Sequence, residues 1–253
     1  FSFRVPVPPL EIQDEIVKVL DTFTELEAEL EAELEARRRQ YKYYRDALLA
    51  FSDQDIRWAA MAELGEFIRG RRFTKADYVE DGVPCIHYGE IYTCYGTTAD
   101  SAISHVRSDM AASLRYAKPG DVVVTDVGET VEDVGKAVAW VGTEDVAIHD
   151  HCYAFRHSMN PKFVSYCMQT SSFIAEKAKY VARTKVNTLL INGFSKIRIP
   201  VPSLEEQARI VAILDKFDAL VNDISVGLPA EIAARRRQYA HYRDRLLTFK
   251  EAA

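Results

Sequence analysis

Apolar residues recur every three or four positions near the start of the chain. The positions are Ile16, Leu20, Phe23, Leu30, Leu34, Tyr41, Tyr44, Leu48 and Phe51, with one gap near Glu27. This spacing predicts one amphipathic helix from about Pro9 to Phe51, roughly 60 Å long. Prolines at positions 6, 8 and 9 suit its start, because a proline lacks the N–H that the first turn leaves unpaired, and they end a short β-like piece, Phe3–Val7. Such a long stripe needs a partner helix.

A second segment, Leu204–Phe249, has the same apolar stripe with an interruption at Gly227-Leu228-Pro229. A proline inside a helix removes a hydrogen bond and clashes with the preceding turn, so we expect a short break near residues 227–229. The two helices enter and leave the same intervening domain. We therefore expect them to pack antiparallel as a stem formed by residues 1–52 and 199–253.

Residues 53–198 have a different pattern, in which short apolar runs are bounded by Gly, Pro and Asp. Four runs are expected to be strands: Cys85–His87, Val122–Thr125, Ala137–Val141 and Cys152–Arg156. Lys162–Val181 is expected to be a helix, and Ile197–Val201 a β-like segment that leads into the second long helix. The predicted fold class is α+β, with one mixed α/β domain and two long antiparallel coiled-coil helices.

Two blocks of sequence occur twice. FRVPVPPLEIQDEIVKVLDTFTEL at 3–26 returns as IRIPVPSLEEQARIVAILDKFDAL at 197–220, and RRRQYKYYRDALLAF at 37–51 returns as RRRQYAHYRDRLLTF at 235–249. The later copy has four extra residues between its blocks. This framing indicates a two-fold or pseudo-two-fold assembly rather than a single-site enzyme. The LEAE repeat at Leu26–Ala36 is typical of an adjustable spacer, although a solvated Glu/Ala helix would look the same.

Charge is unevenly distributed along a chain of net charge −6. Six basic residues and no acid lie between Lys177 and Arg198, and four more flank Gly70, whereas eight acids and one base lie between Asp121 and Asp150. The basic residues are Lys177, Lys179, Arg183, Lys185, Lys196 and Arg198, with Arg69, Arg71, Arg72 and Lys75. Two basic segments on an acidic background favour local binding of a polyanion, with solvated surface charge as the alternative.

The best candidates for contacts to nucleic acid lie in two short segments. His87, Tyr88, Tyr92 and Tyr95 belong to HYGEIYTCYGT, and Arg183, Thr184, Lys185 and Asn187 belong to ARTKVNTLL. Arg and Lys can contact guanine, Asn can contact adenine, and all can contact phosphate. We predict that Arg183, Lys185 and Asn187 contact DNA, with Lys179 nearby and with the residues around Gly70 as phosphate clamps. Tyr88 and Tyr92 could instead be core aromatics with satisfied hydroxyls.

Motifs for catalysis and metal binding are weak. Neither GxGxxG nor GxxxxGK[ST] occurs, and Asn160–Phe163 lacks the second proline of the NPPF motif of amino-methyltransferases. His149–Cys152 contains possible metal ligands, but adjacent residues on a strand point to opposite faces and no second cluster completes the site. The four cysteines show no CxxC spacing, as in a cytoplasmic protein with free thiols. We expect no catalytic residue, metal or cofactor in the chain.

Taken together, these features resemble the DNA-specificity subunit of type I restriction–modification systems. The resemblance rests on the repeated [IV]PVPxLExQ entry, the LDxF segment, RRRQYxxYRDxLL, GLPAEI at Gly227–Ile232, GxxCIHYGEIYT and NTLLINGFSKIRIPVP, which cover nearly the whole chain. In that family, two target-recognition domains each read one half of a split double-stranded DNA target, and two conserved antiparallel helices join them. The resemblance identifies residues 53–198 as one such domain and residues 1–52 and 199–253 as the proximal and distal conserved regions.

The resemblance implies a non-catalytic subunit whose helices set the half-site spacing and dock methyltransferase subunits, and through them the restriction subunit. The partner subunits bring S-adenosylmethionine and ATP. With one recognition domain, the chain is expected to be a half-length subunit or a fragment that forms a homodimer through its stem and reads a split palindrome. One alternative is a small DNA methyltransferase, which would bind S-adenosylmethionine; the other is a structural coiled-coil protein, which would show no DNA sequence preference.

Overall fold

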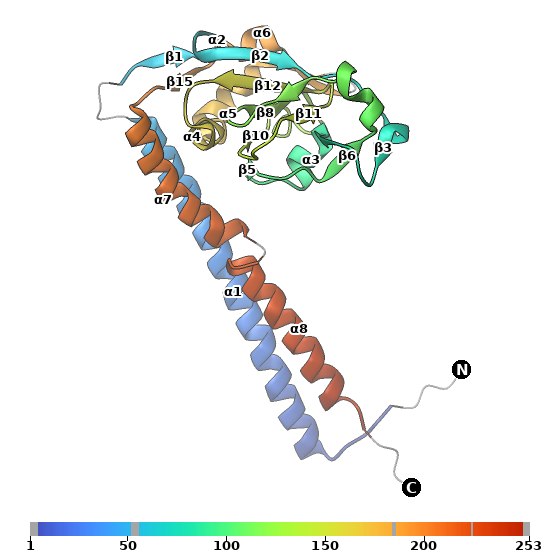
Figure 1. Ribbon diagram of the computed structural model, residues 1–253. Coiled ribbons are helices and arrows are strands. Elements are labelled where there is room, and N and C mark those ends of the chain that lie inside the picture. The colour runs from blue at the N-terminus through green and yellow to red at the C-terminus, as the bar shows by residue number, and fades with distance from the viewer. Residues whose placement is uncertain (1–4, 52–55, 184–185, 224, 250–253) are drawn as a thin grey trace. The chain divides into compact units, whose positions relative to one another are not determined.

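The computed structural model describes residues 5–51, 56–183, 186–223 and 225–249. The chain divides into two compact units, which we call the stem (residues 1–43 and 214–253) and the globular unit (residues 44–213). Their elements are labelled in Figure 1. Helices and strands are both present, so the predicted α+β class is confirmed. Among the described residues, no helix combines the length and apolar character needed to span a bilayer.

The stem contains parts of two long helices, α1 (Leu10–Ala50) and α7 (Leu204–Asn222), and all of α8 (Leu228–Leu246). α1 begins directly after the prolines, where the amides of Ile12 and Gln13 donate to the Pro9 carbonyl oxygen at 3.0 and 3.1 Å. Residues 5–9 are irregular, so the β-like piece predicted at Phe3–Val7 is wrong for residues 5–7, the part of it that the structure describes. A β-strand needs a neighbouring strand to which it can hydrogen-bond, and the described part of the stem contains no strand.

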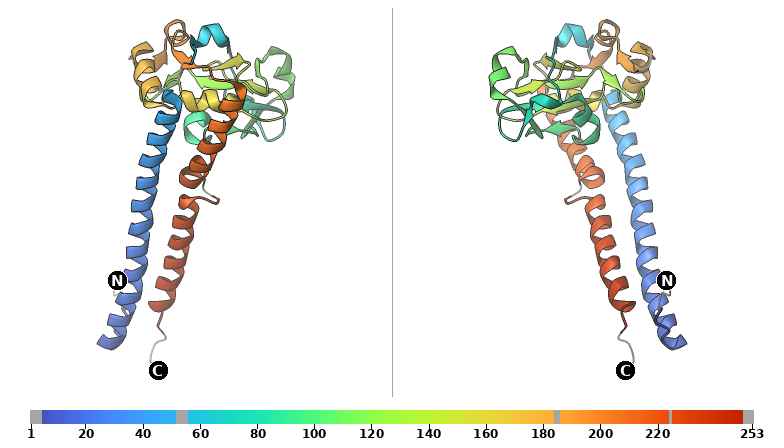
Figure 2. Two further views of the ribbon diagram at one scale, coloured as in Figure 1. Left: turned by 90° about the vertical axis from the view of Figure 1, so that its left-hand side faces the viewer. Right: turned by 90° about the vertical axis from the view of Figure 1, so that its right-hand side faces the viewer.

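Contacts between α1 and α8 run in opposite chain directions, which confirms the antiparallel pairing. The Phe23 ring stacks on Tyr242 with centroids 5.4 Å apart. One turn further along, Arg236 bonds Glu27 and Glu31, each at 2.6 Å. Figure 2 shows the two helices side by side from two directions. The partner helix that the apolar stripe of α1 requires is therefore supplied by the second copy of the repeat.

The predicted break in the second helix is confirmed between Asn222 and Leu228. Gly227 precedes α8, and its amide donates to the Asp223 carbonyl oxygen at 3.0 Å. A Cβ atom at position 227 would lie 2.4 Å from the Ala219 carbonyl oxygen, so this close approach requires glycine. The four extra residues of the second repeat fall between its two blocks, in the stretch that contains this break.

Two five-stranded sheets form the centre of the globular unit. The first has the order β2 (Gly65–Arg69), β12 (Cys152–His157), β8 (Val122–Thr125), β10 (Ala137–Trp140) and β5 (Thr98–Ala99). The second has the order β3 (Tyr78–Val79), β6 (Ser104–Val106), β4 (Val83–Ile86), β11 (Val146–Ile148) and β7 (Tyr116–Ala117). Smaller sheets pair β1 (Trp58–Ala60) with β15 (Arg198–Pro200), and β14 (Asn187–Leu189) with both β13 (Val181–Ala182) and β9 (Val127–Gly128).

The sheets share one apolar core, which explains why several strands are apolar on both faces. Val123, Val138 and Ala154 of the first sheet pack with Ile86 and Ile148 of the second, and all five are buried. α4 (Pro161–Cys167) packs against β8 and β10. Each of the four predicted central strands is confirmed within two residues at its ends. The four cysteines are free.

The single helix predicted over Lys162–Val181 is wrong. The segment contains α4, then α5 (Ser171–Lys177), a 3₁₀ turn at Ala178–Tyr180, and the first residue of β13. Thr170 causes the break: its hydroxyl donates to the Cys167 carbonyl oxygen at 2.9 Å and accepts the Phe173 amide at 3.3 Å. A threonine at this position ends one helix and caps the next. The remaining short helices are α2 (Met61–Leu64), α3 (Tyr88–Thr93), α6 (Ile191–Phe194) and 3₁₀ turns at Lys75–Asp77 and Ser108–Ser113.

Candidate nucleic-acid interface

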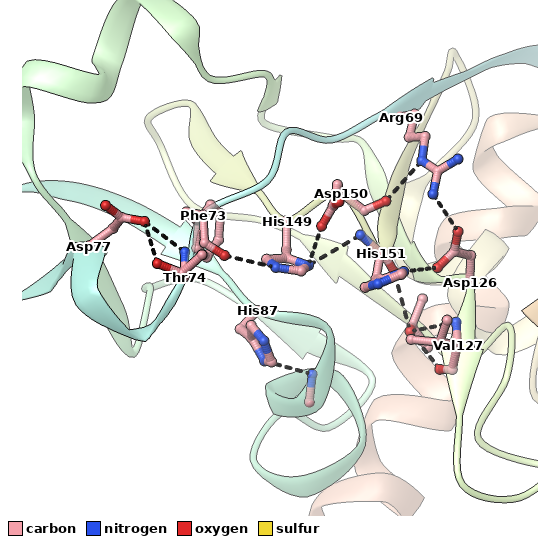
Figure 3. Close-up of polar contacts among 12 residues, drawn as sticks. Arg69, Phe73, Thr74, Asp77, His87, Asp126, Val127, His149, Asp150 and His151 are labelled. Atoms are coloured by element: carbon pink, nitrogen blue, oxygen red, sulfur yellow. Dashed lines mark hydrogen bonds and ion pairs between the residues drawn. The ribbon is translucent and has the colours of Figure 1, made fainter. Parts of the chain in front are cut away.

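The polar cluster in Figure 3 begins where β2 ends. Arg69 is the last residue of the strand, and Gly70 then passes directly over the segment that precedes β12. A Cβ atom on Gly70 would lie 2.1 Å from the His149 carbonyl oxygen, so only glycine fits. The Arg71 amide donates to the Ile148 carbonyl oxygen at 3.0 Å. This crossing fixes the backbone from which the arginine side chains extend.

A buried carboxylate, Asp126, bonds two exposed side chains of the cluster. Asp126 is 3% exposed. Its Oδ2 accepts Arg69 Nη2 at 3.3 Å, and its Oδ1 lies 3.1 Å from His151 Nδ1. Burial raises the pKa of Asp126, whereas His151 and Arg69 act in the opposite direction. The Arg69 and His151 side chains remain 51% and 39% exposed, so each is anchored on one side and open on the other.

His149 is buried next to His151, with ring centroids 5.5 Å apart. Its Nε2 is 3.1 Å from the Phe73 carbonyl oxygen, and its Nδ1 accepts the His151 amide at 3.2 Å. Burial lowers the pKa of His149 to about 4. Asp150 Oδ1 also lies 3.0 Å from Nδ1. Nδ1 accepts a hydrogen bond from the His151 amide, so it carries no proton to donate to Asp150. The two side chains are therefore in contact without forming an ion pair.

The aromatic segment predicted from HYGEIYTCYGT lies beside the same cluster. His87 caps α3, since its Nδ1 accepts the Gly89 amide at 3.1 Å. The Tyr88 ring lies 4.1 Å from the His87 ring and 5.4 Å from the His151 ring, measured between centroids. Tyr92 continues the group, 6.3 Å from Tyr88. His87, Tyr88 and Tyr92 are half-buried.

Tyr95 differs from the other three and serves the fold. Its hydroxyl accepts the Ile103 amide at 2.9 Å, and its ring packs on the apolar core. Burial raises its pKa to about 12. Tyr88 packs on the same apolar core, so the alternative of a core aromatic describes Tyr88 in part as well as Tyr95.

Asn187 lies on β14, whose backbone is next to Asp126. The strand pairs with β9, which directly follows Asp126, and the Leu189 amide donates to the Asp126 carbonyl oxygen at 2.7 Å. The Asn187 Nδ2 donates to the Glu129 carbonyl oxygen at 2.8 Å. Segments that are far apart in sequence thus meet around Asp126.

The other basic candidates are divided between surface and interior. Arg71, Arg72, Lys75 and Arg183 are exposed, and Thr184 and Lys185 lie outside the described residues. Lys179 is paired with Glu176 at 2.5 Å. Lys177 is buried, its Nζ donates to the Glu132 carbonyl oxygen at 2.8 Å, and burial lowers its pKa to about 8. The acid-free run is therefore not one continuous basic surface.

Sequence reasoning missed Asp126 and His151. Asp126 lies in the acidic stretch, which appeared opposed to anion binding, and His151 was considered only as a metal ligand. Among the described residues, no group of three or more His, Cys, Asp or Glu is arranged to hold a metal ion. The spacing of two histidines around Asp150 was the available signal that side chains gather here.

The chain is similar to known specificity subunits along nearly its whole length. It is 32% identical over 258 residues to the Escherichia coli EcoR124I/EcoR124II type I specificity subunit, covering 97% of this chain and 63% of that protein. It is 29% identical over 267 residues to a type I specificity subunit of Mycoplasma pneumoniae, covering 97% of both. The chain thus spans just under two thirds of the first of these relatives.

Solved structures share the fold. An HsdS subunit from Thermoanaerobacter tengcongensis gives a TM-score of 0.60 at 22% identity, covering 96% of this chain and 60% of that one. A chain from a study of type I R-M system assembly gives 0.71 at 19% identity, with the same coverage. The family model of the type I restriction modification DNA specificity domain matches residues 2–36 and 58–234. The chain therefore belongs to the family of type I restriction–modification DNA specificity domains.

Proposed function

We propose that the chain is a non-catalytic, cytoplasmic subunit that recognises a specific double-stranded DNA sequence for type I methyltransferase subunits. The observation that carries the proposal is the cluster around Asp126, where an exposed Arg side chain, a half-exposed His side chain and a half-buried Tyr ring from separate segments converge, and where the strand that carries Asn187 pairs with β9. Direct readout of base edges requires hydrogen-bonding groups held in a fixed arrangement. Family membership supports DNA as the target. Methyltransferase subunits, and through them a restriction subunit, are the partners that we infer.

We assign Arg183 and Asn187, together with Lys185, which lies outside the described residues, to DNA contacts, and the exposed Arg71, Arg72 and Lys75 to the phosphate backbone. Tyr88 and Tyr92 present half-buried rings next to the same cluster, where they can pack against sugars or bases. The division follows the general pattern in which phosphate contacts position a protein and base contacts select the sequence.

Binding measurements on Arg183→Ala test this assignment. A lost base contact costs about 1–3 kcal/mol on the preferred sequence and relaxes the choice at one position. A lost phosphate contact weakens all sequences alike and lowers the salt slope by about one. Fluorescence anisotropy with preferred and scrambled duplexes at several salt concentrations distinguishes the two. Wild-type affinity in this variant and in Lys185→Ala would remove both residues from the interface.

We also infer that the stem joins two recognition domains. The start of α1 has the same local structure as the start of α7, 194 residues later. Gln13 Nε2 donates to the Pro8 carbonyl oxygen at 2.7 Å, just as Gln207 Nε2 donates to the Pro202 carbonyl oxygen at 2.9 Å. In the globular unit, Gln207 Oε1 also accepts the Asn160 amide at 2.8 Å. This repetition supports a pseudo-two-fold stem with equivalent ends.

A second copy of this chain is the partner that we infer for the stem. Apolar side chains near the start of α1 are exposed: Val5, Val7, Leu10, Ile12 and Val17. Their burial against another stem would favour a homodimer with two reading domains, whose target is a split palindrome. Light scattering at tens of micromolar, with and without the methyltransferase subunit, measures the stoichiometry. A single copy under both conditions contradicts the homodimer and leaves DNA recognition by one domain intact.

A further inference from the structure

Asp126 holds Arg69 in one orientation and leaves part of its guanidinium available. Arg69 Nε donates to the Asp150 carbonyl oxygen at 2.9 Å, and Nη2 donates to Asp126 Oδ2. The guanidinium carbon also lies 5.7 Å from the centre of the Tyr153 ring. An arginine has five N–H donors, and these bonds use two of them. Because the side chain is half-exposed, the remaining donors can reach a ligand outside the protein.

Asp126 also determines which nitrogen of His151 carries the proton. An ionised carboxylate only accepts hydrogen bonds, so the Nδ1 atom 3.1 Å from Asp126 must be the protonated one. In the neutral imidazole, Nε2 is then an acceptor. No hydrogen bond from Nε2 to another described residue is found, and the side chain is 39% exposed. The cluster therefore offers donors from Arg69 beside an acceptor from His151.

The backbone around Asp126 is fixed as well. Its amide donates to the His151 carbonyl oxygen at 2.9 Å, and its own carbonyl oxygen accepts the Leu189 amide. The Thr125 hydroxyl donates to the Val127 carbonyl oxygen at 2.9 Å, and this hydrogen bond stabilises the turn after β8. The carboxylate therefore has a defined position from which both exposed side chains are oriented.

We propose that Asp126 is a positioning residue that sets base specificity, by aiming Arg69 at a guanine and by fixing His151 Nε2 as an acceptor. The acceptor would accept a hydrogen bond from the exocyclic amino group of adenine or cytosine in the major groove, while arginine donates to guanine O6 and N7. This inference rests on the proposed function and adds residues that pattern reasoning did not assign. Arg69 thereby changes from an expected phosphate clamp to a base contact.

Asp126→Asn tests the tautomer directly. The amide has the shape of the carboxylate but one oxygen acceptor and one nitrogen donor. Arg69 can only donate, so it takes the amide oxygen, and the amide nitrogen then faces His151 Nδ1. The amide nitrogen donates to His151 Nδ1, so Nδ1 becomes the acceptor. The ring proton then lies on Nε2, which becomes a donor. At one position the preferred base should change from one that presents an amino group to one that presents an acceptor, guanine or thymine.

The assay is selection from a randomised duplex library at pH 8.5, followed by sequencing of the recovered duplexes. Arg69→Gln should lose roughly 5- to 100-fold of the preference for guanine at one position. Arg71→Gln is the matched control, because this exposed arginine lies two residues away and no hydrogen bond of its guanidinium to a described residue is found. We expect the control to weaken all sequences similarly.

The wild-type selection separates the two proposals. If wild type recovers no motif, the proposed function fails. If wild type recovers a motif that Asp126→Asn retains unchanged, with only lower affinity or a lower melting temperature, the positioning role is overturned. Should Asp126→Asn fail to fold, Arg69→Gln and His151→Ala alter exposed side chains and decide the question. An unchanged motif in both refutes the inference, and an altered motif in either supports it.

Discussion

Duplicating Leu26–Glu29 in α1 tests whether the stem sets the distance between two half-sites. Four added residues lengthen a helix by about 6 Å and rotate it by roughly 40° beyond a full turn. In the structure this stretch faces α8, where Arg236 bonds Glu27 and Glu31. Residues before the insertion, such as Phe23, would therefore move about one turn relative to their α8 partners. The break between α7 and α8 is the place where the second copy can adjust its length.

DNA rises about 3.4 Å per base pair along each strand, so 6 Å corresponds to nearly two base pairs. Local unwinding of the helix pair after a four-residue insertion reduces this value. We therefore expect both half-site sequences to stay the same and the unread spacer to grow by one or two base pairs. The measurement is the methylated motif produced by the variant together with the methyltransferase subunits, read by sequencing that detects methylated bases.

The matched control replaces Glu27 and Glu31 by alanine without changing the length of α1. It removes the two contacts to Arg236, which are exposed and screened by solvent, and should leave the spacer unchanged. A duplication variant with full activity and an unchanged spacer would show that the LEAE repeat is only a solvated helix face. Loss of one half-site sequence would instead show that the stem does more than set a distance.

Three further predictions concern the stability of the globular unit, measured by urea unfolding. Burial lowers the pKa of both His149 and His157 to about 4 while an unfolded histidine titrates near 6.5, so each contributes roughly 2–3 kcal/mol of stability that is present above about pH 6.5 and lost as the pH drops to about 4; His149→Gln should remove the His149 share of this dependence, and an equal slope in both proteins contradicts the assignment. Phe155→Ala removes a fully buried ring stacked in the core and should cost about 3–5 kcal/mol, so a loss below about 1 kcal/mol would be inconsistent with this packing. Gln207→Ala leaves the Asn160 amide without its acceptor and should cost about 1–3 kcal/mol, whereas Gln13→Ala, which loses only the bond from its Nε2 to the Pro8 carbonyl oxygen, should cost much less; equal losses argue against the role of Gln207.

The long helices were predictable because a stripe of period 3.6 over some forty residues has no competing explanation. The central strands were predictable because uninterrupted apolar runs such as Val122–Thr125 are covered on both faces. The helix from Lys162 was predicted too long, since a single capping threonine, Thr170, divides it. Strands of two residues, such as β3 and β13, are too short for any periodicity and exist only through pairing with distant segments.

The site was predictable by residue type and not by arrangement. Arg69 was identified as a phosphate clamp because it belongs to the basic cluster around Gly70, and Asn187 was identified because asparagine can contact adenine. Asp126 could not be identified from the sequence, because its partners Arg69 and His151 are 57 and 25 residues away. Its acidic neighbourhood also indicated a surface that would not bind a polyanion. Lys177 illustrates the converse: a lysine in a basic run looks like surface charge until burial and its bond to the Glu132 carbonyl oxygen are known.

We propose that residues 53–198 select the DNA sequence that a methyltransferase modifies. The most direct measurement expresses the chain with type I methyltransferase subunits and maps every methylated site in the host genome. We predict one recurrent motif, methylated at nearly all of its occurrences, that changes at a defined base when Arg69 is replaced by glutamine. Two results would contradict DNA selection by this domain. One is methylation without any motif, and the other is a motif that stays the same when the whole of residues 53–198 is replaced with another recognition domain.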